Sequence, residues 1–311
     1  MNVQNGYTKV VVLGAGGFVG INLVKKLVES GYEVICFDLH PCQHWPAHVK
    51  VILGDFSLLP EELMSELNNA IVFHLISSCR PSINTSNAQQ EIGNDLLNTI
   101  HYLERSLSKN LRWVFLSSGG TVYGQTELER IPESYPCSPI CTYGAVKLSV
   151  ESYFSIYHKI HNTDFVVARL ANPYGAWQWP DRGQGIVPTI INKILHSEVI
   201  EIWGTGEQIR DYIHIEDAIN GLLILAQFGR SGEVYNVGTG TGLSLNSVVS
   251  KISKVVCSVP ILHYMPSRLS DVSKNILDCS KIKNNFGWSH EITFEDGVFS
   301  TVQWIHEFCR S

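Results

Sequence analysis

The chain has 311 residues, of which 44% are hydrophobic and 17% are charged, and its formal net charge at pH 7 is −6. This composition is that of a globular protein, and the negative charge disfavours nucleic acid or an acidic membrane surface as the main partner. No apolar stretch approaches the roughly 20 residues of a membrane-spanning helix, and the polar segment 1–9 does not resemble a signal peptide. The sequence therefore predicts a cytoplasmic protein.

Short apolar runs alternate with helix-like segments up to about residue 170. The run KVVVL at 9–13 has the continuous apolar character of a parallel strand covered on both faces, and 18–29 carries apolar residues at helical spacing. This alternation predicts βαβ units and a parallel sheet, hence an α/β, Rossmann-type, doubly wound fold. We expect further strands at 32–37, 49–53, 70–76, 111–116 and 164–170, and further helices at 88–108 and 143–161.

The character of the sequence changes after residue 172, where Pro and Gly become frequent and the strand-like runs shorten. We expect residues 1–172 to form a dinucleotide-binding domain and residues 173–311 to form mainly a smaller C-terminal α/β lobe for substrate. The segment 216–237 is expected to pack back onto the first domain. Helices are predicted at 186–196, 216–228, 244–256 and 295–309.

The first βα turn is rich in glycine. Gly14, Gly17 and Gly20 lie between the strand at 9–13 and the helix at 18–29. Absent side chains let a pyrophosphate approach the backbone at a helix N-terminus, where unpaired N–H groups favour negative charge. A glycine pattern in this position, between strand and helix, predicts dinucleotide binding.

Acidic residues follow the next two strands. Asp38 ends the second strand, at a spacing from the glycines where a carboxylate accepts the adenosine ribose hydroxyls. The segment 39–46 contains no Arg or Lys that would neutralise a 2′-phosphate, so NAD is predicted rather than NADP. Asp55 and Phe56, after the third strand, are suited to the amino group and the face of the adenine.

Tyr143 and Lys147 lie four positions apart at the start of a predicted helix, and therefore on one helix face. The helix follows the fifth strand, at the carboxyl edge of the sheet where ligands bind in doubly wound folds. An unperturbed tyrosine has a pKa of about 10, but a nearby ammonium and a positively charged nicotinamide stabilise the phenolate. We therefore predict that Tyr143 is an acid–base group assisted by Lys147.

Taken in order, these features resemble the extended short-chain dehydrogenase/reductase family, and within it the nucleotide-sugar epimerases of the UDP-hexose 4-epimerase type. The resemblance covers nearly the whole chain. Besides Asp38, its motifs are GAGGFVG at 14–20, GDF at 54–56, HLIS at 74–77, SSGGTVYG at 117–124, YGAVK at 143–147, RLANPYG at 169–175, RDYIHIEDA at 210–218, YNVG at 235–238 and RLSD at 268–271.

The resemblance implies two sets of binding residues. Those expected to hold NAD are Gly14, Gly17, Phe18, Val19, Gly20, Asp38, Asp55, Phe56, Leu75, Ile76, Ser77, Asn94, Tyr143 and Lys147. Those expected to contact the sugar nucleotide, with UDP as the expected nucleotide, are Asn172, Ile186, Trp203, Arg210, Tyr212 and Arg268. The two arginines would clamp the diphosphate, because guanidinium forks match phosphate oxygens.

Residues 118–121 depart from the family pattern. The family usually has a catalytic Ser or Thr four residues before the tyrosine of Val-Tyr-Gly, and that position here is Gly119. The hydroxyl must therefore come from Ser118 or Thr121. Strand alternation favours Thr121, because residues 119 and 121 share one side if the backbone stays extended. The pair Gly120-Thr121 also disfavours the sugar 4,6-dehydratases, which carry Asp-Glu there.

The reaction implied by the resemblance is epimerisation at C4 of a nucleotide sugar through a 4-keto intermediate, with NAD as cofactor. Two alternatives stay open: an NAD(P)H-dependent 4-ketoreductase of a deoxysugar pathway, and a catalytically silent NAD-binding regulator. The family also implies a homodimer built from helices 88–108 and 143–161. Val146, Val150 and Phe154 are available to fill its seam.

Eight cysteines are scattered through the chain without CxxC spacing, so we expect free thiols in a reducing compartment. The cluster His40, Cys42, His44 and His48 contains zinc-type ligands, but no second ligand pair completes a tetrahedral site. We interpret it as a histidine-rich surface loop and expect no metal.

Overall fold

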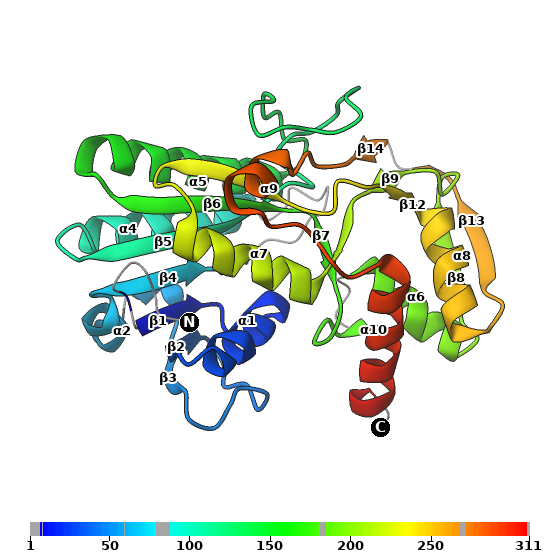
Figure 1. The fold of residues 1–311 in the computed structure, drawn as a ribbon, viewed down its shortest axis with the longest axis horizontal. Helices are drawn as coiled ribbons and strands as arrows, with labels where there is room; N and C mark the ends of the chain where they lie inside the picture. The colour runs from blue at the N-terminus through cyan, green and yellow to red at the C-terminus, as the bar shows by residue number, and fades with distance from the viewer. Residues whose placement is uncertain are drawn as a thin grey trace.

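The computed structural model describes residues 7, 9–58, 60–78, 88–180, 185–267 and 272–309. Its centre is a sheet of seven parallel strands in the order β11-β6-β5-β4-β1-β2-β3 (Figure 1). The strand order reverses beside β1, as in doubly wound folds, so the predicted Rossmann-type fold is confirmed. The strands are β1 Lys9–Leu13, β2 Glu33–Asp38, β3 Lys50–Leu53, β4 Ala70–His74, β5 Leu111–Ser118, β6 Asp164–Leu170 and β11 Glu233–Val237.

Both faces of the sheet are apolar and covered by helices. In β1, Val10 and Val12 belong to one buried cluster and Val11 and Leu13 to the other, because successive side chains point to opposite faces. This explains why the strand sequences are continuously apolar rather than alternating.

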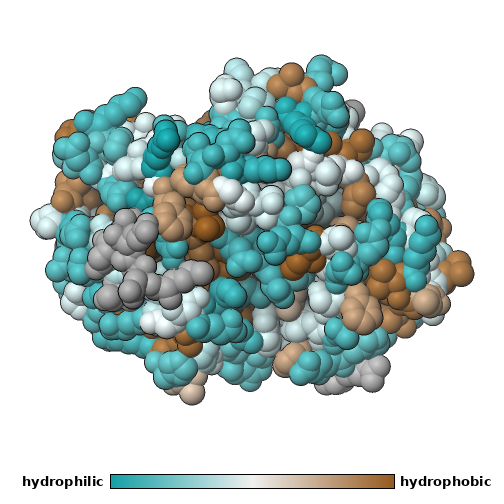
Figure 2. Space-filling view, viewed as in Figure 1, coloured by the Kyte–Doolittle hydropathy of each residue, from teal (hydrophilic) through white to brown (hydrophobic). Residues whose placement is uncertain are grey.

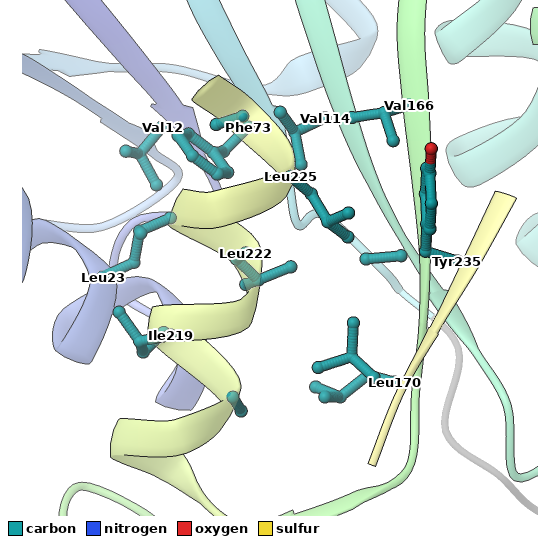
Figure 3. Packing of buried hydrophobic residues seen from close by; sticks show 14 of the residues in the cluster. Val12, Leu23, Phe73, Val114, Val166, Leu170, Ile219, Leu222, Leu225 and Tyr235 are labelled. Atoms are coloured by element: carbon teal, nitrogen blue, oxygen red, sulfur yellow. The ribbon is translucent and has the colours of Figure 1, made fainter. Parts of the chain in front are cut away.

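α1 (Phe18–Glu29) and α7 (Ile215–Phe228) cover the first face. Figure 3 shows Leu222 and Leu225 of α7 between Leu23 of α1 and residues of the strands. β11 is thus a strand of the main sheet and α7 packs on it, although both follow part of the C-terminal region in the chain.

α4 (Asn98–Arg105) and α5 (Thr142–His161) cover the second face, together with the short α2 (Glu61–Glu66). The predicted helix 88–108 is interrupted: α3 (Ala88–Glu91) leads into the π-helical segment η2 (Ile92–Leu97) before α4 begins. Such π-helical turns are uncommon and occur frequently at functional sites.

The C-terminal region has its own apolar cluster, on the right of Figure 1. The helices α6 (Ile186–Leu195), α8 (Leu245–Val256) and α10 (Phe294–Phe308) contribute to it. The remaining elements are short: η1 Phe56–Leu58, the strand pairs β7 Asn172–Tyr174 with β10 Tyr212–His214 and β8 Val199–Trp203 with β13 Ile261–Met265, the three-stranded sheet of β12 Leu243–Ser244, β9 Ile209–Arg210 and β14 Lys274–Asn275, and the helix α9 Ser280–Phe286.

The face of the molecule seen in Figure 2 is mostly hydrophilic, and its hydrophobic residues lie in separate small groups. Within the described residues, no helix is long and apolar enough to cross a membrane.

Candidate active site

The glycine-rich turn brings the start of α1 close to the end of β1. Gly14 has a φ of +85°, and its N–H donates to Phe37 O at 2.9 Å. A Cβ on Gly20 would lie only 2.3 Å from Gly14 O, so no larger residue fits there without movement. Gly17 caps α1 without a side chain, and the first turn carries no acidic residue. The helix N-terminus is therefore suited to bind an anion such as pyrophosphate.

Two cavities meet at this turn. The larger, of about 720 Å³, extends towards the C-terminal region, and the smaller, of about 460 Å³, extends towards the ends of β2 and β3. Gly14, Gly17, Leu75 and Ser77 line both. A dinucleotide whose pyrophosphate lies at α1 would thus place one nucleoside in each cavity, so the residues present fit NAD.

The smaller cavity contains the carboxylates expected for the adenosine half. Asp38 Oδ2 accepts from Gly16 N and Oδ1 accepts from Leu39 N, both at 2.8 Å, and a carboxylate retains further lone pairs for ribose hydroxyls. Hydrogen bonds from Ser57 lower the pKa of the exposed Asp55 below its usual value, so this carboxylate is ionised at neutral pH.

Phe56 also lines the smaller cavity, but its ring is buried. It stacks on Tyr102 with ring centroids 4.2 Å apart and an interplanar angle of 6°. One face of the ring is thus already covered, which leaves at most the other face and the edge for adenine.

The opposite wall comes from η2 and the residues after β4. Ile76 and the predicted Asn94 line it, and so does Asp95, which the sequence analysis missed. The buried Asp95 carboxylate accepts from Ser77 Oγ at 2.9 Å and from Ser78 N at 2.8 Å. Asp95 therefore holds the Ser77 side chain at the junction of the two cavities.

Ser118 and Tyr143 line the larger cavity, whereas Lys147 is buried and is not among its described lining residues. Lys147 Nζ donates to Leu116 O at 3.1 Å and lies 5.7 Å from the centroid of the Tyr143 ring. The start of α5 thus brings a phenol and an ammonium close together, and the phenol lines the same cavity as the Ser118 hydroxyl at the end of β5. Phe18, Val19 and Gly20 of the first turn line the same cavity.

Thr121 is favoured only if the backbone stays extended beyond Ser118, and this condition is not met. Residues 119–121 form a turn, in which Thr121 N and Val122 N donate to Ser118 O at 3.3 and 3.2 Å. Thr121 Oγ1 is buried without a hydrogen-bond partner among the described residues, and Thr121 is absent from the described lining of the larger cavity. The geometry therefore favours Ser118 over Thr121.

The far wall of the larger cavity contains five of the residues expected to contact substrate: Asn172, Ile186, Trp203, Arg210 and Tyr212. Burial raises the pKa of Tyr212 to about 12, so its hydroxyl is protonated at neutral pH. The sixth, Arg268, lies outside the described residues.

Two glutamines in this wall were not predicted from the sequence. Gln178 Nε2 donates to Pro173 O and Gln208 Nε2 donates to Trp203 O, at 3.2 and 3.1 Å. Among the described residues neither Oε1 atom has a hydrogen-bond partner, although both are buried. A glutamine in a Pro- and Gly-rich segment gave no signal that would separate it from an ordinary loop residue.

The histidine-rich segment after β2 packs on aromatic side chains. The ring of His44 lies 4.4 Å from the ring of Trp177, centroid to centroid. Over the part of the chain that the structure describes, no group of three or more His, Cys, Asp and Glu side chains is arranged to hold a metal ion.

The chain is similar in sequence and fold to known proteins. The profile of the NAD dependent epimerase/dehydratase family matches residues 10–238. The chain is 27% identical to a putative UDP-glucose 4-epimerase of Methanocaldococcus jannaschii, over 95% of this chain and 98% of the relative. It is 26% identical to a dTDP-4-dehydro-6-deoxyglucose reductase of Escherichia coli, over 95% of this chain and 97% of the relative.

Two solved structures show the same fold over nearly the whole chain. The UDP-glucose 4-epimerase of Thermotoga maritima with UDP-glucose has 29% identity and a TM-score of 0.90, covering 97% of this chain and 100% of that chain. The UDP-glucose 4-epimerase of Thermus thermophilus in complex with NAD has 26% identity and a TM-score of 0.87, covering 96% and 99%.

Proposed function

Because this protein belongs to the NAD dependent epimerase/dehydratase family, we propose that it uses NAD to epimerise C4 of a nucleotide sugar, with a UDP-sugar as substrate. One observation carries the proposal. Ser118 and Tyr143 line a cavity that is bounded by the glycine-rich turn on one side. Asn172 and Arg210 line its other side. A reacting carbon can therefore lie between an acid–base pair and a cofactor while its nucleotide extends towards the arginine.

When bound, NAD supplies a hydride acceptor and donor for C4. Tyr143 takes the proton of the C4 hydroxyl, and the Lys147 ammonium behind it stabilises the phenolate. Ser118 donates a hydrogen bond to the same sugar oxygen. After the 4-keto sugar has turned its other face towards the cofactor, Tyr143 returns the proton to the oxygen on C4. A cavity of about 720 Å³ is of the size that encloses ligands of this class and leaves room for the turn.

Arg210 is assigned to the diphosphate, since a guanidinium fork pairs well with phosphate oxygens. Asn172 is assigned to the sugar, and its side-chain amide is fixed by donation to Asp211 O at 2.9 Å. Ile186, Trp203 and Tyr212 are assigned to the nucleoside. We further propose that 1–172 with 216–237 is the NAD-binding domain and that the rest of 173–311 is the substrate lobe.

The test is to incubate purified protein with UDP-glucose, UDP-N-acetylglucosamine and UDP-glucuronate without added cofactor. Formation of the C4 epimer of any of these, abolished by Tyr143→Phe, is the expected result. The similarity to the Escherichia coli reductase gives a second candidate: turnover of a 4-keto sugar only with added NADH or NADPH would replace epimerisation by reduction. Bound NAD without turnover of either kind would indicate a regulator.

We also propose a homodimer, and the structure changes which residues would form it. Val146, Val150 and Phe154 are not available, because all three are buried within the protein itself. Val150 and Phe154 pack on the sheet, where the rings of Phe154 and Phe115 are 5.5 Å apart, centroid to centroid. Ile156 and Ile160 are 44% and 66% exposed and lie on one face of α5. Ile160→Asp should convert a dimer to a monomer in light scattering, and a wild-type monomer at micromolar concentration would exclude the proposal.

A further inference from the structure

A row of buried polar side chains crosses three neighbouring strands at the floor of the larger cavity, which Ser117 helps to line. Ser117 of β5, Arg169 of β6 and Asn236 of β11 are direct partners in the strand register. They are only 2%, 6% and 0% exposed. The next residues on β5 and β6, Ser118 and Leu170, line the cavity. A guanidinium is almost never buried to this degree unless it is paired.

Glu151 of α5 is the partner. Its carboxylate accepts from Arg169 Nε at 3.1 Å, from Arg169 Nη2 at 2.7 Å and from the Ser117 hydroxyl. Burial alone would lower the pKa of Arg169, but the hydrogen bonds and charge of Glu151 raise it above its ordinary value. The guanidinium therefore stays charged and forms a forked pair with the carboxylate.

Glu151 lies on the same face of α5 as Tyr143 and Lys147. The three residues follow at intervals of four, each about 6 Å along the helix axis. Lys147 donates to Leu116 O, and Glu151 accepts from Ser117. The helix is thus fixed to two successive residues of β5, immediately before the hydroxyl assigned to the sugar oxygen.

Stability alone does not account for this pair. Removing two charges from water costs about as much as their attraction contributes, and well-packed apolar replacements are often equally stable or more so. A buried pair is better suited to select one arrangement of elements among several. Here that arrangement is the position of α5 along the ends of β5 and β6, which lie beside it in Figure 1.

We propose that the pair of Glu151 and Arg169 positions Tyr143 relative to Ser118 for proton transfer. The proposal rests on the proposed epimerase function. The nucleotide contacts assigned to Arg210 come from a different element, β9. Loss of the pair should therefore lower kcat and leave KM for the nucleotide sugar nearly unchanged.

The chain contains a matched control at the opposite ends of the same two strands. Arg112 and Asp164 are direct partners in the register of β5 and β6, and Arg112 Nη1 donates to Asp164 Oδ1 at 2.8 Å. Arg112 is buried like Arg169. This second pair lies about 17 Å along the strands from the first, so its loss perturbs an ion pair of the same sheet without reaching the cavity.

The experiment compares Glu151→Gln, Asp164→Asn and the double variant Glu151→Leu/Arg169→Met, each as full-length protein with its cofactor. Misplacement of a reacting group by about 1 Å can cost on the order of 100-fold in rate. We therefore expect Glu151→Gln to lower kcat about tenfold or more, with KM and NAD content within about threefold of wild type. Asp164→Asn should keep kcat within about twofold of wild type, even if its melting temperature falls by as much as that of Glu151→Gln.

The double variant separates positioning from stability. It should regain the melting temperature lost in Glu151→Gln, because no charge is left unpaired, while kcat stays low. Equal losses of kcat in the two single variants, or recovery of kcat in the double variant, would overturn the proposal. A wild type without turnover would instead refute the proposed function. The crystal structure of Glu151→Gln then decides, because a Tyr143 hydroxyl unmoved relative to Ser118 excludes positioning.

Discussion

The contact between α1 and the glycine-rich turn allows a quantitative test of the NAD site through Gly20→Ala. The added methyl group would lie 2.3 Å from Gly14 O and 2.8 Å from Ala15 Cα. Ordinary contacts between heavy atoms begin at about 3.5 Å, so α1 must move away from the turn by roughly 1 Å. Overpacking of this kind costs about 1–3 kcal/mol. The movement carries the N–H groups at the start of α1 away from the position of the pyrophosphate.

If this cost falls on the NAD-bound form, NAD affinity drops by about 5- to 150-fold. The assay is calorimetric titration of NAD into protein from which the cofactor has been removed. Gly93→Ala is the control, because a methyl group at this helical position would meet no described atom within 4 Å. Gly20→Ala with an affinity within twofold of wild type would show that close packing of this turn does not form the pyrophosphate site.

Cofactor choice, the proton-transfer hydroxyl and the buried His74 can each be tested. NAD should bind at least about tenfold more tightly than NADP, and Asp38→Asn should narrow that ratio; equal wild-type affinities would contradict the role of Asp38. Tyr143→Phe should lower kcat by about 10²–10⁴-fold. Ser118→Ala should lower kcat by about tenfold or more, and Thr121→Ala by less than about threefold. The reverse order of the two alanine variants would assign the hydroxyl beside the sugar to Thr121. Burial lowers the pKa of His74 to about 3, so the unfolded chain binds a proton below about pH 6.5 that the folded protein excludes, and the free energy of unfolding should fall from pH 6.5 towards pH 3. Urea unfolding at several pH values measures this dependence. The free energy of unfolding of His74→Gln should change less with pH than that of the wild type, and an equal change in both would assign the pH dependence to other groups.

The helices and strands whose own apolar pattern is long enough could be predicted from the sequence. β1, α1 and β6 have the bounds that their apolar patterns predict, 9–13, 18–29 and 164–170. The strands are covered on both faces, so every residue in them contributes to the pattern. Their spacing also led to the glycine-rich turn and to Asp38 at the carboxyl ends of strands, and to Tyr143 at the start of α5. A doubly wound fold places its ligands at this edge of the sheet.

Elements fixed by distant partners were not predictable in the same way. β7 has three residues and pairs with β10, where Asn172 is the register partner of Tyr212. Neither segment has a pattern long enough to indicate a strand. The π-helical segment η2 was missed for a related reason: the buried Asp95 is held by Ser77 and Ser78 from another part of the chain, and nothing in its own neighbourhood indicates that.

Distant contacts also determine the course of the backbone between Ser118 and Thr121, and therefore which of the two hydroxyls lines the cavity. Asn275 Nδ2 donates to Gly119 O across 156 positions of sequence, and a Cβ on Gly119 would lie 2.5 Å from the side chain of Leu277. The C-terminal region therefore occupies the space where a side chain at 119 would be, and the chain turns there instead of continuing β5. Glycine at 119 follows from that packing. The turn leaves Ser118 as the last side chain of the strand and directs it into the cavity. In the proposed site, the hydroxyl therefore comes from one residue earlier than in the family pattern, and Ser118 lines the same cavity as Tyr143.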